Sequence, residues 1–162
     1  MLRASSILTS NASRMTPPRF WEQKSLTELT REEWESLCDG CGLCCVQKLE
    51  DEDTGDVYFT DLACRLLDTE ACRCTDYERR SDEVEACLVL SPDRPEAYRW
   101  LPGSCAYRRR HEGRELPGWH HLVCGDREAV HEIGVSVRGK VASERDTAEW
   151  TTLRVLADES ES

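Results

Sequence analysis

The chain has 162 residues, of which 39% are hydrophobic and 33% are charged, and its formal net charge is -11. This length suits a single domain with a modest core and a heavily solvated surface. The negative net charge repels nucleic-acid phosphates and anionic lipids, so we expect neither a nucleic acid nor a membrane among the partners.

The first 18 residues predict a disordered N-terminal extension that ends at Pro17-Pro18. They lack the continuous apolar stretch of a secretory signal. No run of about 18 apolar residues occurs along the chain, which excludes a membrane-spanning helix. We therefore expect a cytoplasmic protein, and Met15 is an alternative start of translation.

A first helix is predicted to begin near Thr30, because Thr30 and Glu33 have the spacing of a capping box. Trp34 and Leu37 follow at positions that face inward. The helix should end at Asp39-Gly40, and it thus leads the chain into the first cysteines.

Two short strands, Val46 to Leu49 and Val57 to Thr60, flank an acidic turn and predict a β-hairpin. The turn lacks the spacing and the closing Glu of a twelve-residue calcium loop, so a solvated turn is preferred to a calcium site.

The remaining segments predict short helices and loops, ordered by cross-links or metal over residues 61–90. Helices are expected from Ser91-Pro92 through Trp100, from Cys105 to Glu112 with Ser104 as its cap, and from Asp126 to Glu132, with a strand at Val135 to Val137. Residues 141–162 should form a C-terminal helix or tail, acidic and disordered at its end. The predicted fold is α+β: a small irregular metal-centred domain over residues 19–140, mostly short helices with a β-hairpin.

The ten cysteines carry the strongest functional signal. Cytosolic thiols stay reduced, so a dense set indicates metal binding or redox chemistry. In a secreted chain the same ten residues would predict up to five disulfides.

Residues 38–45 read Cys-Asp-Gly-Cys-Gly-Leu-Cys-Cys. A two-residue gap that contains a glycine occurs twice, from Cys38 to Cys41 and from Cys41 to Cys44, and the glycines allow the backbone to bend sharply. Thiolates crowded in this way repel one another unless a cation compensates them, and a metal lowers the thiol pKa so that the ligands ionise at neutral pH. The segment therefore predicts a transition-metal site. Cys45 must diverge from Cys44 and is expected to bind a second ion or to face the core.

The other cysteines are less clearly placed by sequence. Cys72 and Cys74 form a second, weaker cluster, while Cys64, Cys87 and Cys105 are single residues that could complete either site or serve as buried structural thiols. Cys124 is expected to be incidental.

Zinc and iron remain open as the metal. Zinc prefers four tetrahedral Cys or His ligands, and the first three cysteines have the C-x2-C-x2-C run of bacterial ferredoxins without the fourth Cys that a Pro follows. His120, His121 and His131 are possible nitrogen ligands, although a packed, hydrogen-bonded role is preferred for His120. The thiols suffice for two ions or clusters.

Three functions are compatible with these observations. The first is a metal-binding protein that coordinates zinc or iron, the second an iron–sulfur redox protein or enzyme component, and the third a thiol–disulfide oxidoreductase that uses Cys41 and Cys44. No catalytic triad, phosphate loop or dinucleotide fingerprint occurs, so no catalytic or organic-cofactor-binding residue is predicted.

The sequence resembles the YcgN-like bacterial cysteine-cluster proteins, which belong to a wider group described as zinc- or iron-chelating CxxCxxCC domains. The resemblance covers residues 19–140 and is carried by Phe20-Trp21, residues 33–45, Lys48-Leu49, residues 51–54, Tyr58 to Thr60, Ala63 to Arg65, Cys72 to Cys74, Tyr77 to Arg80, Trp100 to Pro102, Cys105 to Arg108, Leu116 to His120 and Ser136 to Arg138.

This resemblance implies a small cytosolic protein that chelates a metal, and it supplies no reaction. The metal ligands that it implies are Cys38, Cys41, Cys44, Cys45, Cys64, Cys72, Cys74, Cys87 and Cys105. Cys124 lies outside the family pattern.

Overall fold

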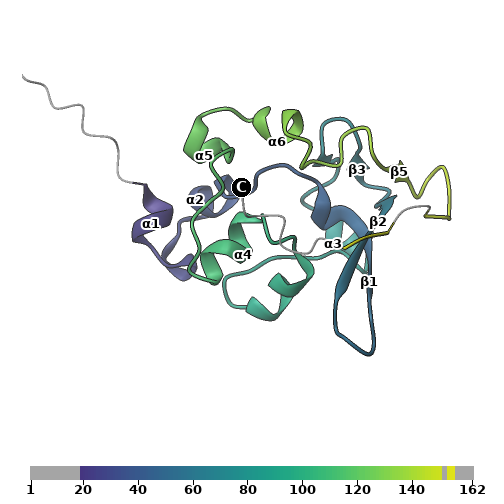
Figure 1. Cartoon of the computed structure of the whole chain (residues 1–162), viewed down its shortest axis with the longest axis horizontal. Helices are drawn as coiled ribbons and strands as arrows, with labels where there is room; N and C mark the ends of the chain where they lie inside the picture. The colour runs from purple at the N-terminus through teal and green to yellow at the C-terminus, as the bar shows by residue number, and fades with distance from the viewer. Residues whose placement is uncertain (1–18, 151–152, 156–162) are drawn as a thin grey trace, which may run out of the picture.

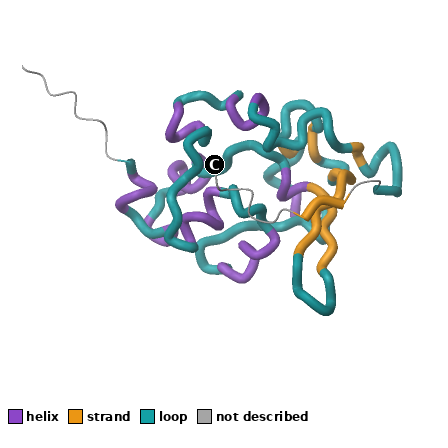
Figure 2. Tube along the Cα trace, in the orientation of Figure 1, coloured by secondary structure: helices purple, strands orange, loops and turns teal. Residues whose placement is uncertain are grey.

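The computed structural model describes residues 19–150 and 153–155. Most helices lie in one half of the molecule and the strands lie in the other (Figures 1 and 2). The helical half contains α1 (Phe20–Gln23), η1 (Leu26–Glu28), α2 (Arg31–Ser36), η3 (Pro95–Trp100), α4 (Ala106–His111), α5 (His121–Cys124) and α6 (Ala129–Glu132). The strand half contains β1 (Val46–Glu50), β2 (Val57–Ala63), β3 (Leu67–Asp68), β4 (Arg73–Cys74), α3 (Arg80–Glu83), β5 (Ala142–Ser143) and β6 (Leu153–Val155). The predicted α+β class is confirmed.

The capping box at the start of α2 is confirmed. The Glu33 backbone N–H donates to Thr30 Oγ1 at 3.2 Å, and the Thr30 backbone N–H donates to a Glu33 carboxylate oxygen at 2.9 Å. Such caps stabilise a short helix by about 1 kcal/mol. Trp34 packs on Tyr107 of α4 with ring centroids 4.5 Å apart, and Leu37 is fully buried at the end of the helix. These contacts attach α2 to the helical core.

The helical core is rich in large side chains. Its buried members are Trp21, Leu37, Tyr98, Leu101, Ala106, Tyr107 and Leu116. Two predictions in this half need correction: the residue that caps α4 is Cys105 and not Ser104, and the helix predicted up to Trp100 is a 3₁₀ helix that begins only at Pro95. Proline is favoured there because its fixed φ suits the first turn.

The predicted β-hairpin is confirmed, since β1 and β2 pair antiparallel. Asp51 fixes the turn by accepting the backbone N–H groups of Asp53 and Thr54, as a solvated turn does without calcium. Strand β2 also pairs with β5 in parallel and with β6 antiparallel, so the sheet continues past residue 140. The strand core is smaller and consists of Val46, Phe59, Ala63, Leu67, Cys72 and Val137.

The strand predicted at Val135 to Val137 is wrong. The Val137 backbone N–H donates to the carbonyl of Cys41 at 2.9 Å, and the Ser136 N–H donates to the carbonyl of Val130, so no strand ladder forms. The short strands β3 and β4 were not expected from the sequence of residues 61–90. The predicted N-terminal extension and the acidic end of the chain lie outside the described residues.

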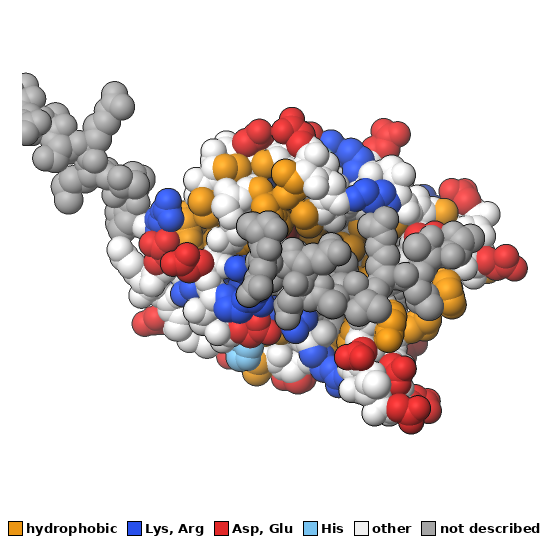
Figure 3. Space-filling view, viewed as in Figure 1, with side chains coloured by type: hydrophobic (Ala, Val, Ile, Leu, Met, Phe, Trp, Pro, Cys, Tyr) orange, Lys and Arg blue, Asp and Glu red, His pale blue; other side chains and the backbone are white. Residues whose placement is uncertain are grey.

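Acidic side chains lie mostly around the edge of the face shown in Figure 3, in keeping with the negative net charge. Among the helices of residues 19–150, none combines the length and apolar character needed to cross a lipid bilayer.

Candidate metal centre

The cysteine-rich segment joins the two halves of the molecule. It leaves α2 in the helical half, forms the short 3₁₀ helix η2 (Leu43–Cys45) and continues directly into β1 of the strand half (Figure 1). Its last two cysteines pack against different cores, Cys44 against the helical core and Cys45 against the strand core. The predicted divergence of their side chains is nevertheless wrong for the sulfur atoms, which remain in contact.

A buried histidine fixes the start of this segment. His120 is fully buried; its Nε2–H donates to the carbonyl of Leu37 at 2.9 Å, and its Nδ1 accepts the backbone N–H of Leu122 at 3.1 Å. These two bonds require the neutral tautomer, and burial lowers the pKa of His120 in agreement. The expected packed, hydrogen-bonded role of His120 is confirmed, and both of its nitrogens are occupied.

Both glycines of the segment adopt the left-handed conformation that the predicted bends require, with φ of 79° at Gly40 and 77° at Gly42. Gly42 is also needed for space, because a Cβ atom there would lie 2.7 Å from Val137 Cγ2. The Asp39 carboxylate completes the first bend by accepting the backbone N–H of Cys41 at 2.9 Å. The backbone thus turns the cysteine side chains toward both halves.

Four thiols, which we call the first set, interact electrostatically beside the helical core: Cys38, Cys41, Cys44 and Cys105. Burial raises the pKa of Cys38 to about 12, although the residue as a whole is exposed, and raises the pKa of Cys41 and Cys105 well above the ordinary value. The negative charge of Asp39 is the next cause for all three. The pKa of Cys44 is raised first by its contact with Cys45 and then by burial.

Backbone N–H groups oppose these shifts at three thiols of the first set. Gly40 lowers the pKa of Cys38, Leu43 that of Cys41, and Arg108 that of Cys105. Hydrogen bonds from the backbone to sulfur stabilise the thiolate form, which is the form that binds a metal. The first set therefore has partial support for the ionised state from the backbone.

A second set consists of Cys45, Cys64, Cys74 and Cys87, of which Cys45 packs against the strand core. The Cys64 N–H donates to the carbonyl of Cys45 at 2.7 Å. Burial raises the pKa of Cys87, and the charges of Cys64, Cys74 and Cys44, the last a member of the first set, raise it further. All four residues of this set are half-buried.

The two sets meet at the adjacent cysteines, where the sulfurs of Cys44 and Cys45 lie 3.8 Å apart. Lys48 lies beside this contact: its ammonium donates to the carbonyls of Cys44 and Val46 at 2.8 and 3.0 Å. Burial lowers the pKa of Lys48, and the negative charges of Cys44, Cys45, Cys41 and Cys87 oppose that shift. One half-buried ammonium therefore faces thiols of both sets.

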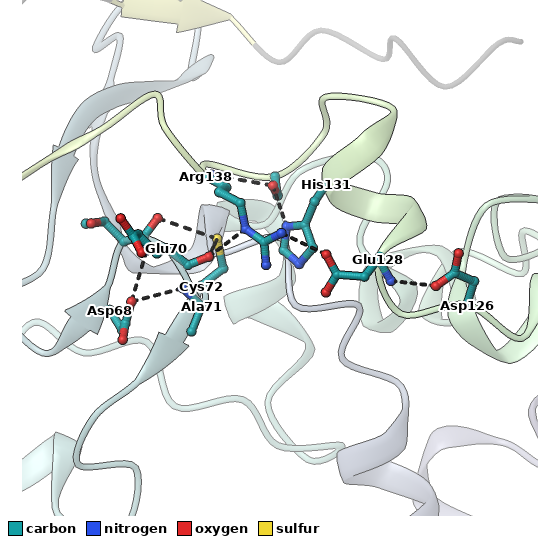
Figure 4. A network of polar contacts seen from close by, with 10 residues as sticks. Asp68, Glu70, Ala71, Cys72, Asp126, Glu128, His131 and Arg138 are labelled. Atoms are coloured by element: carbon teal, nitrogen blue, oxygen red, sulfur yellow. Dashed lines mark hydrogen bonds and ion pairs between the residues drawn. The ribbon is translucent and has the colours of Figure 1, made fainter.

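Cys72 is assigned to neither set, although it lies beside the cysteine segment: its Sγ would be 3.8 Å from a Cβ atom at Gly42. It is buried in the strand core with a φ of 56°, and its thiol pKa is raised by burial and lowered by Arg138 and Ser136 (Figure 4). No other cysteine is among the groups that shift it. Cys124 is exposed, and its thiol donates to the carbonyl of Trp119, as expected for an incidental residue.

The other histidines differ in their availability. His131 Nδ1 bonds Ser136 Oγ at 2.7 Å. His121 stacks on His120 with centroids 4.4 Å apart, and within the described residues neither of its ring nitrogens makes a hydrogen bond. Burial lowers the pKa of His121 to about 4. His121 is thus neutral and retains a free nitrogen.

The donor chemistry of both sets fits zinc or iron, because four thiolates are the usual ligands of tetrahedral zinc and of iron–sulfur centres. All ten cysteines are unpaired thiols. In residues 19–150 and 153–155, however, no three Cys, His, Asp or Glu side chains already converge as a metal-binding group. Coordination at about 2.3 Å therefore requires the thiols of a set to move inward together.

Residues 37–106 match the CxxCxxCC family, described as a "Putative zinc- or iron-chelating domain", which supports metal binding by this segment. This match begins one residue before the first cysteine of the two sets and ends one residue after the last. The chain is 55% identical over 130 residues to a UPF0260 protein of Pseudomonas putida, which covers 80% of this chain and 87% of the relative. It is 56% identical over 130 residues to a UPF0260 protein of Ectopseudomonas mendocina, with the same shares covered, and 52% identical over 138 residues to one of Pseudomonas fluorescens, covering 85% and 91%. No solved structure is significantly similar.

Proposed function

Since the chain belongs to the UPF0260 family, we propose that it is a protein that binds zinc or iron at two sites, one in each set of four cysteines. The observation that carries this proposal is that the adjacent residues Cys44 and Cys45 pack against different cores. Cys105 packs against the helical core together with Cys44, and the charges of Cys38, Cys41 and Cys105 link these thiols to Cys44. One ion would thus be held on each side of the peptide bond between Cys44 and Cys45.

A structural contribution of the ions is part of this proposal. The chain is poor in hydrophobic residues, and its two cores are small and separate. Metal binding to a four-thiolate site contributes folding free energy on the order of 10 kcal/mol. Ions held between residues 38–45 and later segments would connect the two halves. Reduced thiols are needed for this, which favours the cytosol as the compartment.

The same sets suit iron–sulfur clusters, which remain the second candidate because the C-x2-C-x2-C run is present. A thiol–disulfide oxidoreductase has less support. Redox-active cysteines have a lowered pKa, whereas the pKa values of both Cys41 and Cys44 are raised well above the ordinary value.

Anaerobic purification of the full chain followed by elemental analysis tests the proposal. We expect two zinc or iron ions per chain, and the visible spectrum distinguishes the candidates. Zinc-bound protein is colourless, and iron bound to thiolates is coloured. An iron–sulfur cluster is brown, contains sulfide and bleaches with dithionite. Correctly folded protein without a stoichiometric metal would contradict metal binding altogether.

Two cysteines only two positions apart provide a matched comparison. Cys74 is in the second set, whereas Cys72 is outside both. We expect Cys74→Ala to lower the metal content from two ions to one, and Cys72→Ala to retain both ions. Loss of an ion in the Cys72 variant would show that the division into two sets is wrong.

A further inference from the structure

Asp39 is a buried carboxylate with one bonded and one unbonded oxygen. The residue is 8% exposed, and Oδ1 accepts the Cys41 N–H at 2.9 Å. Oδ2 is fully enclosed and has no hydrogen-bond partner within the described residues. A buried anionic oxygen without a partner is strongly unfavourable, so such groups in proteins are paired or bind a metal.

The surroundings of Asp39 add negative charge once the thiols ionise. Its charge raises the pKa of Cys38, Cys41, Cys44 and Cys105, which together are the whole first set. The charge of Asp39 also raises the pKa of the His120 imidazole, which burial lowers, but both imidazole nitrogens are already hydrogen-bonded to the backbone. The position that would best satisfy Oδ2 is therefore the position of a cation shared with sulfurs of the first set.

We propose that Asp39 Oδ2 is an oxygen ligand of the divalent ion held by the first set. This inference rests on the proposed function and extends it: a tetrahedral ion has four positions, so the carboxylate would take the place of one of the four thiolates. The bond from the Cys41 N–H to Oδ1 fixes the carboxylate within the loop between Cys38 and Cys41 and leaves Oδ2 as the free donor. At Cys87 of the second set, the charged groups that shift the thiol pKa are Arg80 and other cysteines, with no carboxylate among them.

The substitution Asp39→Asn distinguishes the roles of the two carboxylate oxygens. The amide carbonyl can still accept the Cys41 N–H, so the bend is retained, while the anionic oxygen is lost. Titration of the full chain against a zinc-binding chromophore should show one ion bound about ten- to a hundredfold more weakly and the other unchanged. Asp51→Asn is the matched control, because Asp51 also accepts backbone N–H groups in a turn, and no thiol is among the groups that shift its pKa. It should change neither affinity.

X-ray absorption of the zinc-loaded Cys87→Ala chain gives a second measurement that does not depend on the folding of the Asp39 variant. That chain should hold its single ion in the first set, and we expect an oxygen neighbour of zinc in addition to sulfur. A sulfur-only environment there, or unchanged affinities in Asp39→Asn, would overturn the inference. Those outcomes leave the two-site proposal standing, whereas a wild-type chain that binds no zinc removes the proposed function itself.

Discussion

The two halves of the molecule place their cysteines in different environments. The first set lies beside a core with Trp21, Tyr98 and Tyr107, and burial raises the pKa of its thiols strongly. The second set packs through Cys45 against a core of smaller side chains, and its members are half-buried, as are Cys44 and Cys105 of the first set. Burial raises the pKa of Cys87 in the second set less strongly than that of Cys41 or Cys105. Desolvation that disfavours a free thiolate also excludes water and competing ligands from a metal bound there. The comparison therefore predicts a tightly enclosed first ion and a more accessible second one.

The largest effect is expected when each set loses one ligand. Cys41→Ala should lower the unfolding free energy by about 5 kcal/mol or more, because the ion and its link to the helical core are both lost. Cys87→Ala should cost about 2 kcal/mol, because its half-exposed set contributes less to either core. Denaturant unfolding combined with elemental analysis of each variant measures both quantities. Equal losses of unfolding free energy in the two variants would show that the two sets stabilise the fold equally.

Opposite pH responses are expected for the metal-free and metal-bound states. In the metal-free fold the pKa of Cys38 is raised from 9.0 to about 12. The folded state holds this proton more tightly than the unfolded state, so the associated stability is present below about pH 9 and is lost as the pH rises toward 12. In the metal-bound state protons compete for the sulfurs, so affinity falls on acidification by up to about tenfold per pH unit for each proton displaced.

Thermal unfolding across this pH range, with and without a chelator, measures both responses. A metal-free protein that gains stability above pH 9 would contradict the burial of these thiols.

A smaller effect separates the two glycines of the cysteine segment. Alanine at either position adopts an unfavourable positive φ, at about 1 to 2 kcal/mol. At Gly42 the added methyl also meets Val137 of the strand core, which costs about 1 to 3 kcal/mol more, whereas nothing lies within 4 Å of a Cβ at Gly40. The difference between the unfolding free energies of Gly42→Ala and Gly40→Ala thus measures how firmly the segment is held against the strand half. A difference near zero between the two variants would show that the cysteine segment moves to accommodate the added methyl group.

Local features of the fold could be predicted from sequence because their causes are local. The capping box of α2 and the β-hairpin depend on residues a few positions apart, and both are confirmed. The contact of His120 with Leu37 joins residues 83 positions apart, and it decides where the cysteine segment begins. Val137 could not be placed either, because its backbone partner is Cys41 and not a neighbouring strand.

The sequence indicates which cysteines are candidate ligands, but it does not indicate how they are arranged. The spacing of residues 38–45 identifies the thiols and the need for glycine. It does not assign Cys105 to one set and Cys87 to the other, because that depends on how α4 and α3 pack. The sequence reasoning also missed Asp39, although a carboxylate placed two residues before a cysteine, where it can accept that residue's N–H, was a usable signal.

The order of the cysteines along the chain has a consequence for biosynthesis. Every member of the second set lies between Cys44 and Cys105, so one site is nested inside the loop that the other closes. A growing chain exposes all four inner thiols before Cys105 has been translated. On the two-site assignment, the second set can bind its ion during translation. The first set is completed only when Cys105 has been synthesised, and the protein then folds around an ion that is already bound.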